Sequence, residues 1–317
     1  MLAIAGAAAW PLEARAQQAM PVVGFLSGRS PAESATVLAA FRKGLSESGY
    51  AEPQNVTIDF RWAEGRPDRL PELASQLVHR PVDVIAALGE SGSAAKAATI
   101  TIPVVFGSGG DPVQTGLVPS LNHPGSNVTG ATFFTATLGA KRLGLLRELV
   151  PGAEVIALLA NPDKSVGQVQ INDVTEAARA LGQKILVLDG GSDDKIQAAF
   201  AALAPQHVSA LLVGADPFFD TRRDRLVALA SLHQMPAIYQ FREYALAGGL
   251  MSYGTSITEM YRLVGVYVGR ILKGENPADL PVVRVTTFEL VINLKTAKAL
   301  GIMIPQTLQV AADEVIE

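Results

Sequence analysis

The chain of 317 residues contains no cysteine. Disulfide scaffolds, CxxC redox motifs, thiolate zinc sites, iron–sulfur clusters and cysteine nucleophiles all need a thiol, so these classes are excluded. Positive charge is also scarce, because 26 Lys and Arg stand against 30 Asp and Glu and leave a net charge of −4. Nucleic-acid binding needs a clustered basic face, so we expect no nucleic-acid partner.

Familiar catalytic and nucleotide-binding motifs are absent as well. The sequence has no GxGxxG, no GxxxxGK[ST] and no GxSxG, so it gives no support for those phosphate sites or for a nucleophile elbow. The four histidines form neither a HExxH nor a HxH pair; they are His79, His123, His207 and His233. We therefore expect no enzyme activity, no catalytic residue, no metal site and no cofactor.

The N-terminal segment differs from the rest of the chain. Leu2–Leu12 is apolar and about half the length that spans a bilayer. Ala14-Arg15-Ala16 follows, a small-x-small pattern typical of a signal-peptidase site. We interpret residues 1–16 as the remnant of a secretory signal cleaved near Ala16, with a frayed N-terminal helix as the alternative. The mature chain would then be periplasmic.

An internal repeat, offset by roughly 130 residues, organises the remainder. Each half has four apolar runs separated by segments in which apolar residues recur with helical period. The predicted strands are 22–26, 56–60, 82–88 and 103–106 in the first half, and 155–159, 185–188, 208–213 and 236–239 in the second. After residue 254 the pattern leaves the repeat, with a predicted helix at 256–273, a strand at 281–285 and a short helix at 293–300.

Continuous apolar strands that alternate with helices indicate parallel sheets covered on both faces. The fold class predicted is therefore α/β, with two doubly wound parallel-sheet lobes joined by a crossover hinge. We expect lobe 1 to hold residues 21–134 plus about 254–283, and lobe 2 residues 135–253 plus about 284–317.

Ligands of open α/β sheets bind outside the carboxyl ends of the strands. Small residues dominate two of these ends in the first half, GESGS at 89–93 and GSGGDP at 107–112, so backbone N–H groups there could approach a carboxylate. Acidic residues also follow the strands, and a ligand ammonium could pair with some of them. They are Glu90, Asp111, Asp163, Asp216, Asp220 and Glu243.

Not all of these acids are equal candidates. Asp163 and Asp220 are as readily helix caps as ligand contacts. Asp111 and Asp216 each precede proline and are less obviously caps, so with Glu90 they are the preferred partners of an ammonium. Ten of the 19 aromatic residues, Phe134 and Tyr239 among them, fall near strand ends or crossovers, which favours an apolar or aromatic ligand body.

Several blocks in order resemble one known family over residues 10–317. They are PVVGFL, DPVQTGLV, NVTGATFF, AGGLMSYG and FELVINLKTAKALGI. The chain resembles the ABC-transporter substrate-binding proteins with the type I periplasmic-binding fold, in the group that includes aromatic and branched amino-acid binders. The family usually carries a longer, basic leader than the one printed here.

The resemblance implies capture of a small amino-acid-like or aromatic carboxylate ligand and its delivery to the membrane permease of an ABC importer, by a monomer that closes like a hinge. The positions on loops that line such ligand sites are Ser27, Glu90, Ser91, Asp111, Asn161, Asp216 and Tyr239. With Phe134 and Glu243 they form the predicted ligand-binding set. The Glu90 carboxylate would repel a ligand carboxylate unless it meets the ammonium.

Two other readings are open. The same two-lobe module could report its ligand to a signalling partner as a sensor ectodomain. An enzyme could use Asp111 and Asp216 across the cleft. A DNA-binding regulator of this fold is disfavoured, because only about 20 residues precede the first strand.

Overall fold

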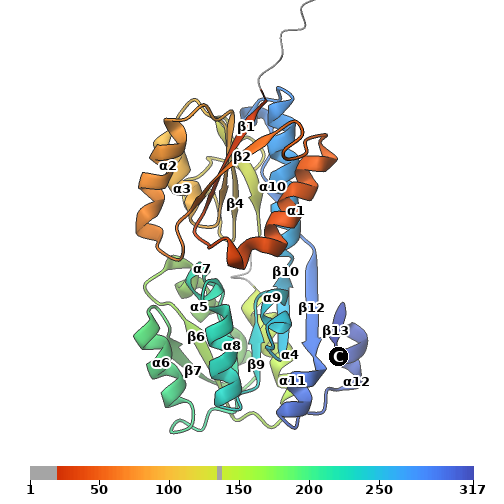
Figure 1. The fold of residues 1–317 in the computed structure, drawn as a ribbon. Coiled ribbons are helices and arrows are strands. Elements are labelled where there is room, and N and C mark those ends of the chain that lie inside the picture. The colour runs from red at the N-terminus through yellow and green to blue at the C-terminus, as the bar shows by residue number, and fades with distance from the viewer. Residues whose placement is uncertain (1–19, 134–137) are drawn as a thin grey trace, which may run out of the picture.

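The computed structural model describes residues 20–133 and 138–317. The predicted signal segment 1–16 and Phe134 lie outside the described residues. The chain forms two β-sheets, one above the other in Figure 1, each flanked by helices on both faces. We call each sheet with its helices a lobe.

Lobe 1 contains a six-stranded sheet in the order β11-β5-β4-β3-β1-β2, in which every pair of neighbours is parallel. Its strands are β1 (Val22–Ser27), β2 (Thr57–Trp62), β3 (Val84–Leu88), β4 (Val104–Ser108), β5 (Val128–Thr132) and β11 (Val283–Arg284). The strand predicted at 281–285 is thus present but only two residues long.

Lobe 2 contains a seven-stranded sheet in the order β13-β12-β10-β9-β8-β6-β7. Its strands are β6 (Val155–Ala160), β7 (Lys184–Asp189), β8 (Ala210–Val213), β9 (Ala237–Tyr239), β10 (Met251–Thr255), β12 (Phe288–Asn293) and β13 (Glu314–Ile316). Only β10 and β12 pair antiparallel. All eight strands predicted from the repeat are present, whereas β5, β10, β12 and β13 were not predicted.

The helices pack on both faces of each sheet. They are α1 (Ala35–Glu47), α2 (Leu70–Val78), α3 (Ser91–Ala98), α4 (Gly139–Leu149), α5 (Ser165–Ala180), α6 (Asp193–Ala202), α7 (Pro217–Asp220), α8 (Arg223–Leu232), α9 (Arg242–Leu246), α10 (Ile257–Leu272), α11 (Leu294–Ala299) and α12 (Gln306–Ala311). In lobe 1, α1 and α10 share one buried apolar cluster and α2 and α3 share another. The predicted doubly wound α/β class is confirmed.

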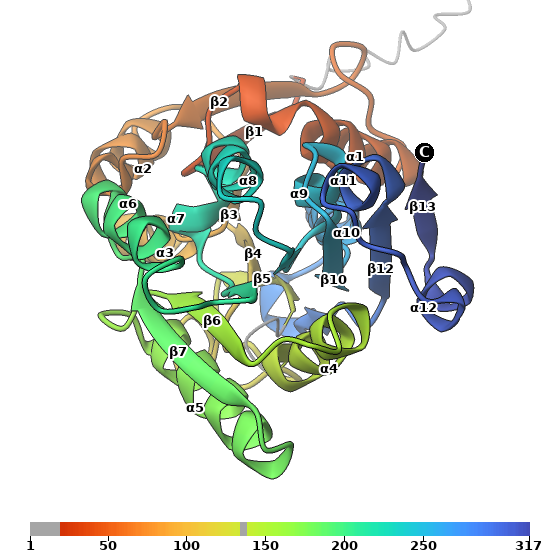
Figure 2. The same cartoon turned by 90° about the horizontal axis from the view of Figure 1, so that it is seen from below.

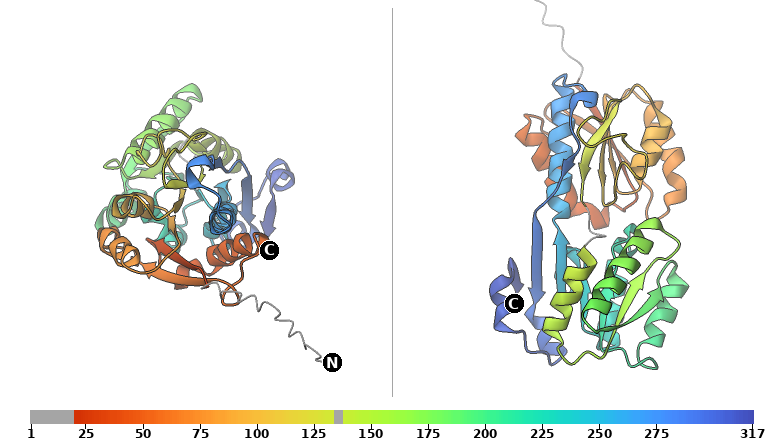
Figure 3. Two further views of the ribbon diagram at one scale, coloured as in Figure 1. Left: turned by 90° about the horizontal axis from the view of Figure 1, so that it is seen from above. Right: turned by 180° about the vertical axis from the view of Figure 1, so that it is seen from behind.

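The chain passes between the two sheets more than once. It leaves lobe 1 after β5, returns from β10 into α10, and crosses again from β11 to β12 (Figures 1 and 3). Seen from below, the crossing strands β10 and β12 lie on the same side of the molecule as α10 (Figure 2). Because the chain passes between the lobes three times, the ways in which the lobes can move relative to each other are restricted.

The helix α10 packs closely on α1, and glycines make this approach possible. A Cβ atom added to Gly44 of α1 would lie 1.9 Å from the Arg262 carbonyl oxygen, and one on Gly265 would lie 2.2 Å from that of Phe41. Any side chain at either position would meet the backbone of the other helix. The crossing helix is therefore held on lobe 1 by backbone-to-backbone contact.

Candidate functional site

The carboxyl ends of the strands from both sheets face each other where the lobes meet. On one side of this interface, Lys164 Nζ after β6 lies 4.0 Å from Glu90 Oε1 after β3. On the other, the Phe133 and Phe241 rings pack edge to face with centroids 5.6 Å apart. Most of the predicted site residues occupy this interface because parallel strands present their carboxyl ends at one edge.

Asp216 follows β8 and begins α7. Its Oδ1 atom accepts a hydrogen bond from the Phe218 backbone N–H at 2.8 Å, so it is the N-cap of this short helix. The sequence made Asp216 a less obvious cap because a proline follows it, but that proline occupies the first helical position, where no N–H is needed. The Oδ2 atom is buried without a partner. One carboxylate thus performs a structural role and still presents a free acceptor.

Glu90 lies near Asp216 across the interface. Burial raises the pKa of Glu90, Lys164 lowers it, and the negative charge of Asp216 raises it again. The side chain remains 37% exposed. The structure therefore brings Glu90 within 4.0 Å of the Lys164 ammonium and close enough to Asp216 to be affected by its charge.

The small polar residues of the predicted set already have partners. The Ser91 hydroxyl donates to the carbonyl oxygens of Leu26 at 2.9 Å and Leu88 at 2.8 Å, tying the start of α3 to β1 and β3. Ser27 Oγ accepts from the Arg29 N–H at 3.2 Å. Asn161 Oδ1 accepts from the Asp163 N–H at 3.2 Å. These side chains order the loops at the interface.

Asp111 is half-buried and stabilises its own turn. Its Oδ1 accepts from the N–H groups of Val113 at 2.8 Å and Gln114 at 3.2 Å, so this less obvious candidate for a cap also satisfies local backbone groups. Asp163 caps no helix and instead pairs with Lys195 at 3.3 Å. Among the described residues, no polar contact joins the Asp111 carboxylate to the rest of the predicted site.

Tyr239 is fully buried at the end of β9, and its ring stacks on that of Tyr244 at 4.8 Å. Its hydroxyl has no partner, and burial raises the pKa of this phenol. Glu243, in the first turn of α9, has both carboxylate oxygens buried without a partner. Burial likewise raises the pKa of Glu243.

Glu243 belongs to a group of charged and aromatic residues, of which Arg29, Tyr244 and Tyr261 were not in the predicted ligand-binding set. We call Arg29, Asp220, Glu243, Tyr244 and Tyr261 the interlobe cluster. Asp220 Oδ1 accepts from Gln240 Nε2 at 2.7 Å and from the Tyr244 hydroxyl at 3.1 Å. Burial, more than any other cause, raises the pKa of Asp220 to about 6. Asp220 is therefore a buried acid of the interface and not a helix cap.

Arg29 contributes the positive charge of the interlobe cluster. Burial by itself would lower its pKa, but Tyr261, Asp220 and Glu243 outweigh that effect and the pKa is raised. Among the described residues, its guanidinium group forms no hydrogen bond or ion pair. Arg29 belongs to lobe 1 and both acids to lobe 2, so the charges act across the interface. The sequence did place Arg29 directly after a strand, and this was the signal that could have identified it.

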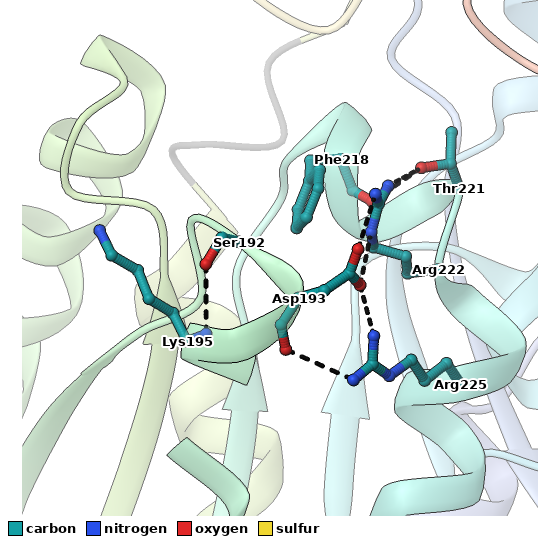
Figure 4. A network of polar contacts seen from close by, with 7 residues as sticks. All are labelled: Ser192, Asp193, Lys195, Phe218, Thr221, Arg222 and Arg225. Carbon is teal, nitrogen blue, oxygen red and sulfur yellow. Dashed lines mark hydrogen bonds and ion pairs between the residues drawn. The ribbon is translucent and has the colours of Figure 1, made fainter. Parts of the chain in front are cut away.

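A separate polar network braces the adjoining edge of lobe 2 (Figure 4). Asp193 accepts from Arg222 Nε at 3.0 Å and Nη2 at 3.1 Å, and it also pairs with Arg225. The Arg222 guanidinium lies 3.6 Å from the centre of the Phe218 ring. Hydrogen bonds from Arg222 are the main reason why the pKa of Asp193 is lowered. The network fixes the start of α6 relative to α7 and α8, and with it the turn that carries Asp216.

Replacing Asp220 by asparagine is expected to raise the thermal midpoint of the ligand-free protein at pH 7.5, by about 4 °C. In the folded state the Asp220 carboxyl group keeps its proton up to about pH 6, whereas an ordinary aspartate loses its proton near pH 4. Stability is therefore lost as pH rises through this window, on the order of 2 kcal/mol, and stays low above it. Thermal denaturation of both proteins at pH 4.5 and 7.5 measures the effect.

Since Glu243 and Glu90 titrate with the same sign, only the difference between wild type and Asp220→Asn isolates Asp220. That difference should grow from pH 4.5 to 7.5. A difference independent of pH would contradict the assignment.

Within the described ranges 20–133 and 138–317, no three His, Cys, Asp or Glu side chains are grouped so that they could hold a metal ion. In the same residues, no helix has the length and apolar character needed to cross a membrane.

The two facing α/β lobes and the acids between them define the class of two-lobed periplasmic-binding-type proteins. The chain belongs to the ABC transporter substrate binding protein family, whose model matches residues 21–316. This is a family of substrate-binding proteins and not of enzymes, so the sequence-based recognition and the expectation of no enzyme are confirmed.

Relatives of this chain include proteins described as amino-acid binders. A "Tyrosine-binding protein" from Clostridioides difficile (strain R20291) is 27% identical over 261 residues, which are 82% of this chain and 75% of that protein. A crystal structure from Streptococcus pneumonia, described as an ABC domain in complex with L-Trp, has 26% identity and a TM-score of 0.83. The match covers 93% of this chain and 99% of that one. A conserved domain protein from Vibrio cholerae has 25% identity, a TM-score of 0.84 and the same coverage.

Proposed function

We propose that this protein is the extracytoplasmic solute-binding component of an ABC importer, and that it captures an aromatic α-amino acid between its two lobes. The ligands named for the Streptococcus and Clostridioides relatives, L-Trp and tyrosine, support this ligand class. Closure of the lobes about their three connections buries the ligand, and the closed monomer is the form that the membrane permease recognises.

One observation carries the proposal. Asp216 presents a buried carboxylate oxygen without a hydrogen-bond partner at the interface between the lobes. A buried charged acceptor left unbonded is costly, and a ligand ammonium removes this cost by donating to it. The capping bond from Phe218 fixes the direction of that oxygen before the ligand arrives.

The ligand carboxylate is assigned to the start of α3. Ser91, Gly92 and Ser93 are the first residues of this helix, and the Glu90 side chain does not cap them. Uncapped backbone N–H groups at a helix N-terminus attract an anion. Glu90, which precedes them, responds electrostatically to Asp216, so the acceptor for the ammonium and the donors for the carboxylate lie at one end of the interface.

Thermal-shift measurement with L-tyrosine and L-tryptophan tests the proposal. At a hundredfold excess over Kd, a ligand that binds only the folded state stabilises it by about 2.7 kcal/mol, so we expect the thermal midpoint to rise by about 4 °C or more. Tyramine, which lacks the carboxylate, and 3-(4-hydroxyphenyl)propionate, which lacks the ammonium, should give no measurable shift. The proposal is wrong if neither aromatic amino acid stabilises the protein.

A further inference from the structure

Glu243 is a buried carboxylate that no described residue satisfies. Both of its oxygens are inaccessible to solvent and accept no hydrogen bond from another residue, and its own backbone N–H is the one hydrogen-bonding group that lowers its pKa. It lies in the first turn of α9, at the carboxyl end of β9, where lobe 2 faces lobe 1. Leaving an ionised carboxylate without donors in such a place is costly, so a donor is missing from this part of the interface.

Positively charged side chains already act on Glu243. Arg29, Arg223 and Arg242 all act on it and lower its pKa against the larger effect of burial. None of these arginines donates a hydrogen bond to it, since Arg223 binds Asp224 at 3.1 Å and Arg242 binds Glu289 at 3.3 Å. The charge of Glu243 is thus compensated at longer range, and the group that would complete it is a neutral hydrogen-bond donor.

Glu243 and Asp216, the proposed acceptor for the ligand ammonium, both lie at the interface between the lobes, but at different ends of it. Arg29 and Tyr261 each respond to both Glu243 and Asp220. Asp220 in turn stands one helical turn after Asp216, a rise of about 6 Å. This is comparable with the length of an aromatic amino-acid side chain, so a ligand whose amino group meets Asp216 is long enough for the end of its ring to reach the interlobe cluster.

We infer that Glu243, assisted by Asp220, accepts a hydrogen bond from a neutral donor at the far end of the ligand's aromatic ring, a phenolic hydroxyl or an indole N–H. This inference rests on the proposed function and narrows its ligand class to aromatic amino acids that carry such a donor. Phenylalanine fills the same space but leaves the carboxylate unbonded. Sites built to hydrogen-bond a ligand group discriminate strongly against the analogue that lacks it, because buried polar groups are then left unpaired.

Isothermal titration of the full-length mature protein with L-tyrosine, L-tryptophan and L-phenylalanine tests the inference. We expect phenylalanine to bind at least a hundredfold more weakly than tyrosine. In the variant Glu243→Met the acceptor is replaced by an apolar side chain, and the ratio of the two affinities should fall below tenfold. The matched control Glu176→Met changes an exposed glutamate on α5 and should leave the ratio as in wild type.

Each outcome decides a different point. If wild type binds phenylalanine within tenfold of tyrosine, the inference is overturned even when Glu243→Met does not fold. If Glu243→Met weakens both ligands equally, Glu243 serves lobe closure and not ring recognition, and the inference is again overturned. If wild type binds none of the three amino acids, the proposed function itself fails.

Discussion

Asparagine at position 216 is expected to weaken the binding of tyrosine or tryptophan by about a hundredfold, or about 3 kcal/mol. Asparagine is as good an N-cap as aspartate, so its side-chain oxygen can still accept from the Phe218 N–H and α7 should be retained. The second oxygen, which has no partner in the structure, becomes an amide NH2 group. A donor then faces the ligand ammonium where an anionic acceptor stood.

Isothermal titration of Asp216→Asn against wild type measures this loss. Asp163→Asn is the matched control, since it makes the same chemical change on a neighbouring loop of lobe 2 where the side chain is 74% exposed and pairs with Lys195. It should change the affinity by less than threefold. Equal affinities for Asp216→Asn and wild type would remove Asp216 from the binding site and would leave the proposal without its main support.

Alanine at position 44 is expected to destabilise the protein by about 3 kcal/mol. The added methyl group would lie 1.9 Å from the Arg262 carbonyl oxygen, so α1 and α10 must move apart and lose buried contacts along their length. Helix propensity acts in the opposite direction, because alanine in a helix interior is favoured over glycine by about 1 kcal/mol. Whether Gly44→Ala lowers or raises the free energy of unfolding therefore shows whether α1 and α10 pack backbone to backbone.

Gly144→Ala provides the comparison. Gly144 lies inside α4, and a Cβ atom there would meet nothing within 4 Å. Only propensity acts at this site, so this variant should be more stable than wild type by about 0.5–1 kcal/mol. Urea denaturation of both variants gives the two free energies of unfolding. A stabilised Gly44→Ala would show that the two helices do not pack backbone to backbone.

Much of the fold was predictable from local pattern. The eight strands of the repeat are short apolar runs, and the helices between them have regular apolar spacing, which hydrophobic periodicity reveals without tertiary information. The amphipathic segment predicted at 256–273 forms α10 at Ile257–Leu272. By contrast β12, FELVIN, lies outside the repeat and is defined by its pairing with β10 and β13, partners that the local sequence does not identify.

The candidate site divides in the same way. The sequence determined which residues stand at the carboxyl ends of the strands, because strand order along the chain and parallel pairing put those ends on one edge. It could not determine which of the acids there are satisfied. Asp111 binds its own turn, Asp216 binds with one oxygen and leaves the other free, and Glu243 is left without a donor.

Only the tertiary structure decided that the charge of Arg29 acts on Asp220 and Glu243. These residues come from different lobes, and the three connections between the sheets bring them together. The sequence by itself determined the class of fold, its repeat and the edge at which a ligand can bind, since these follow from local hydrophobic pattern. Burial and hydrogen bonding of each polar side chain depend on partners that are distant along the chain. For that reason only the tertiary structure determines which polar groups of the site are satisfied and which are free to bind a ligand.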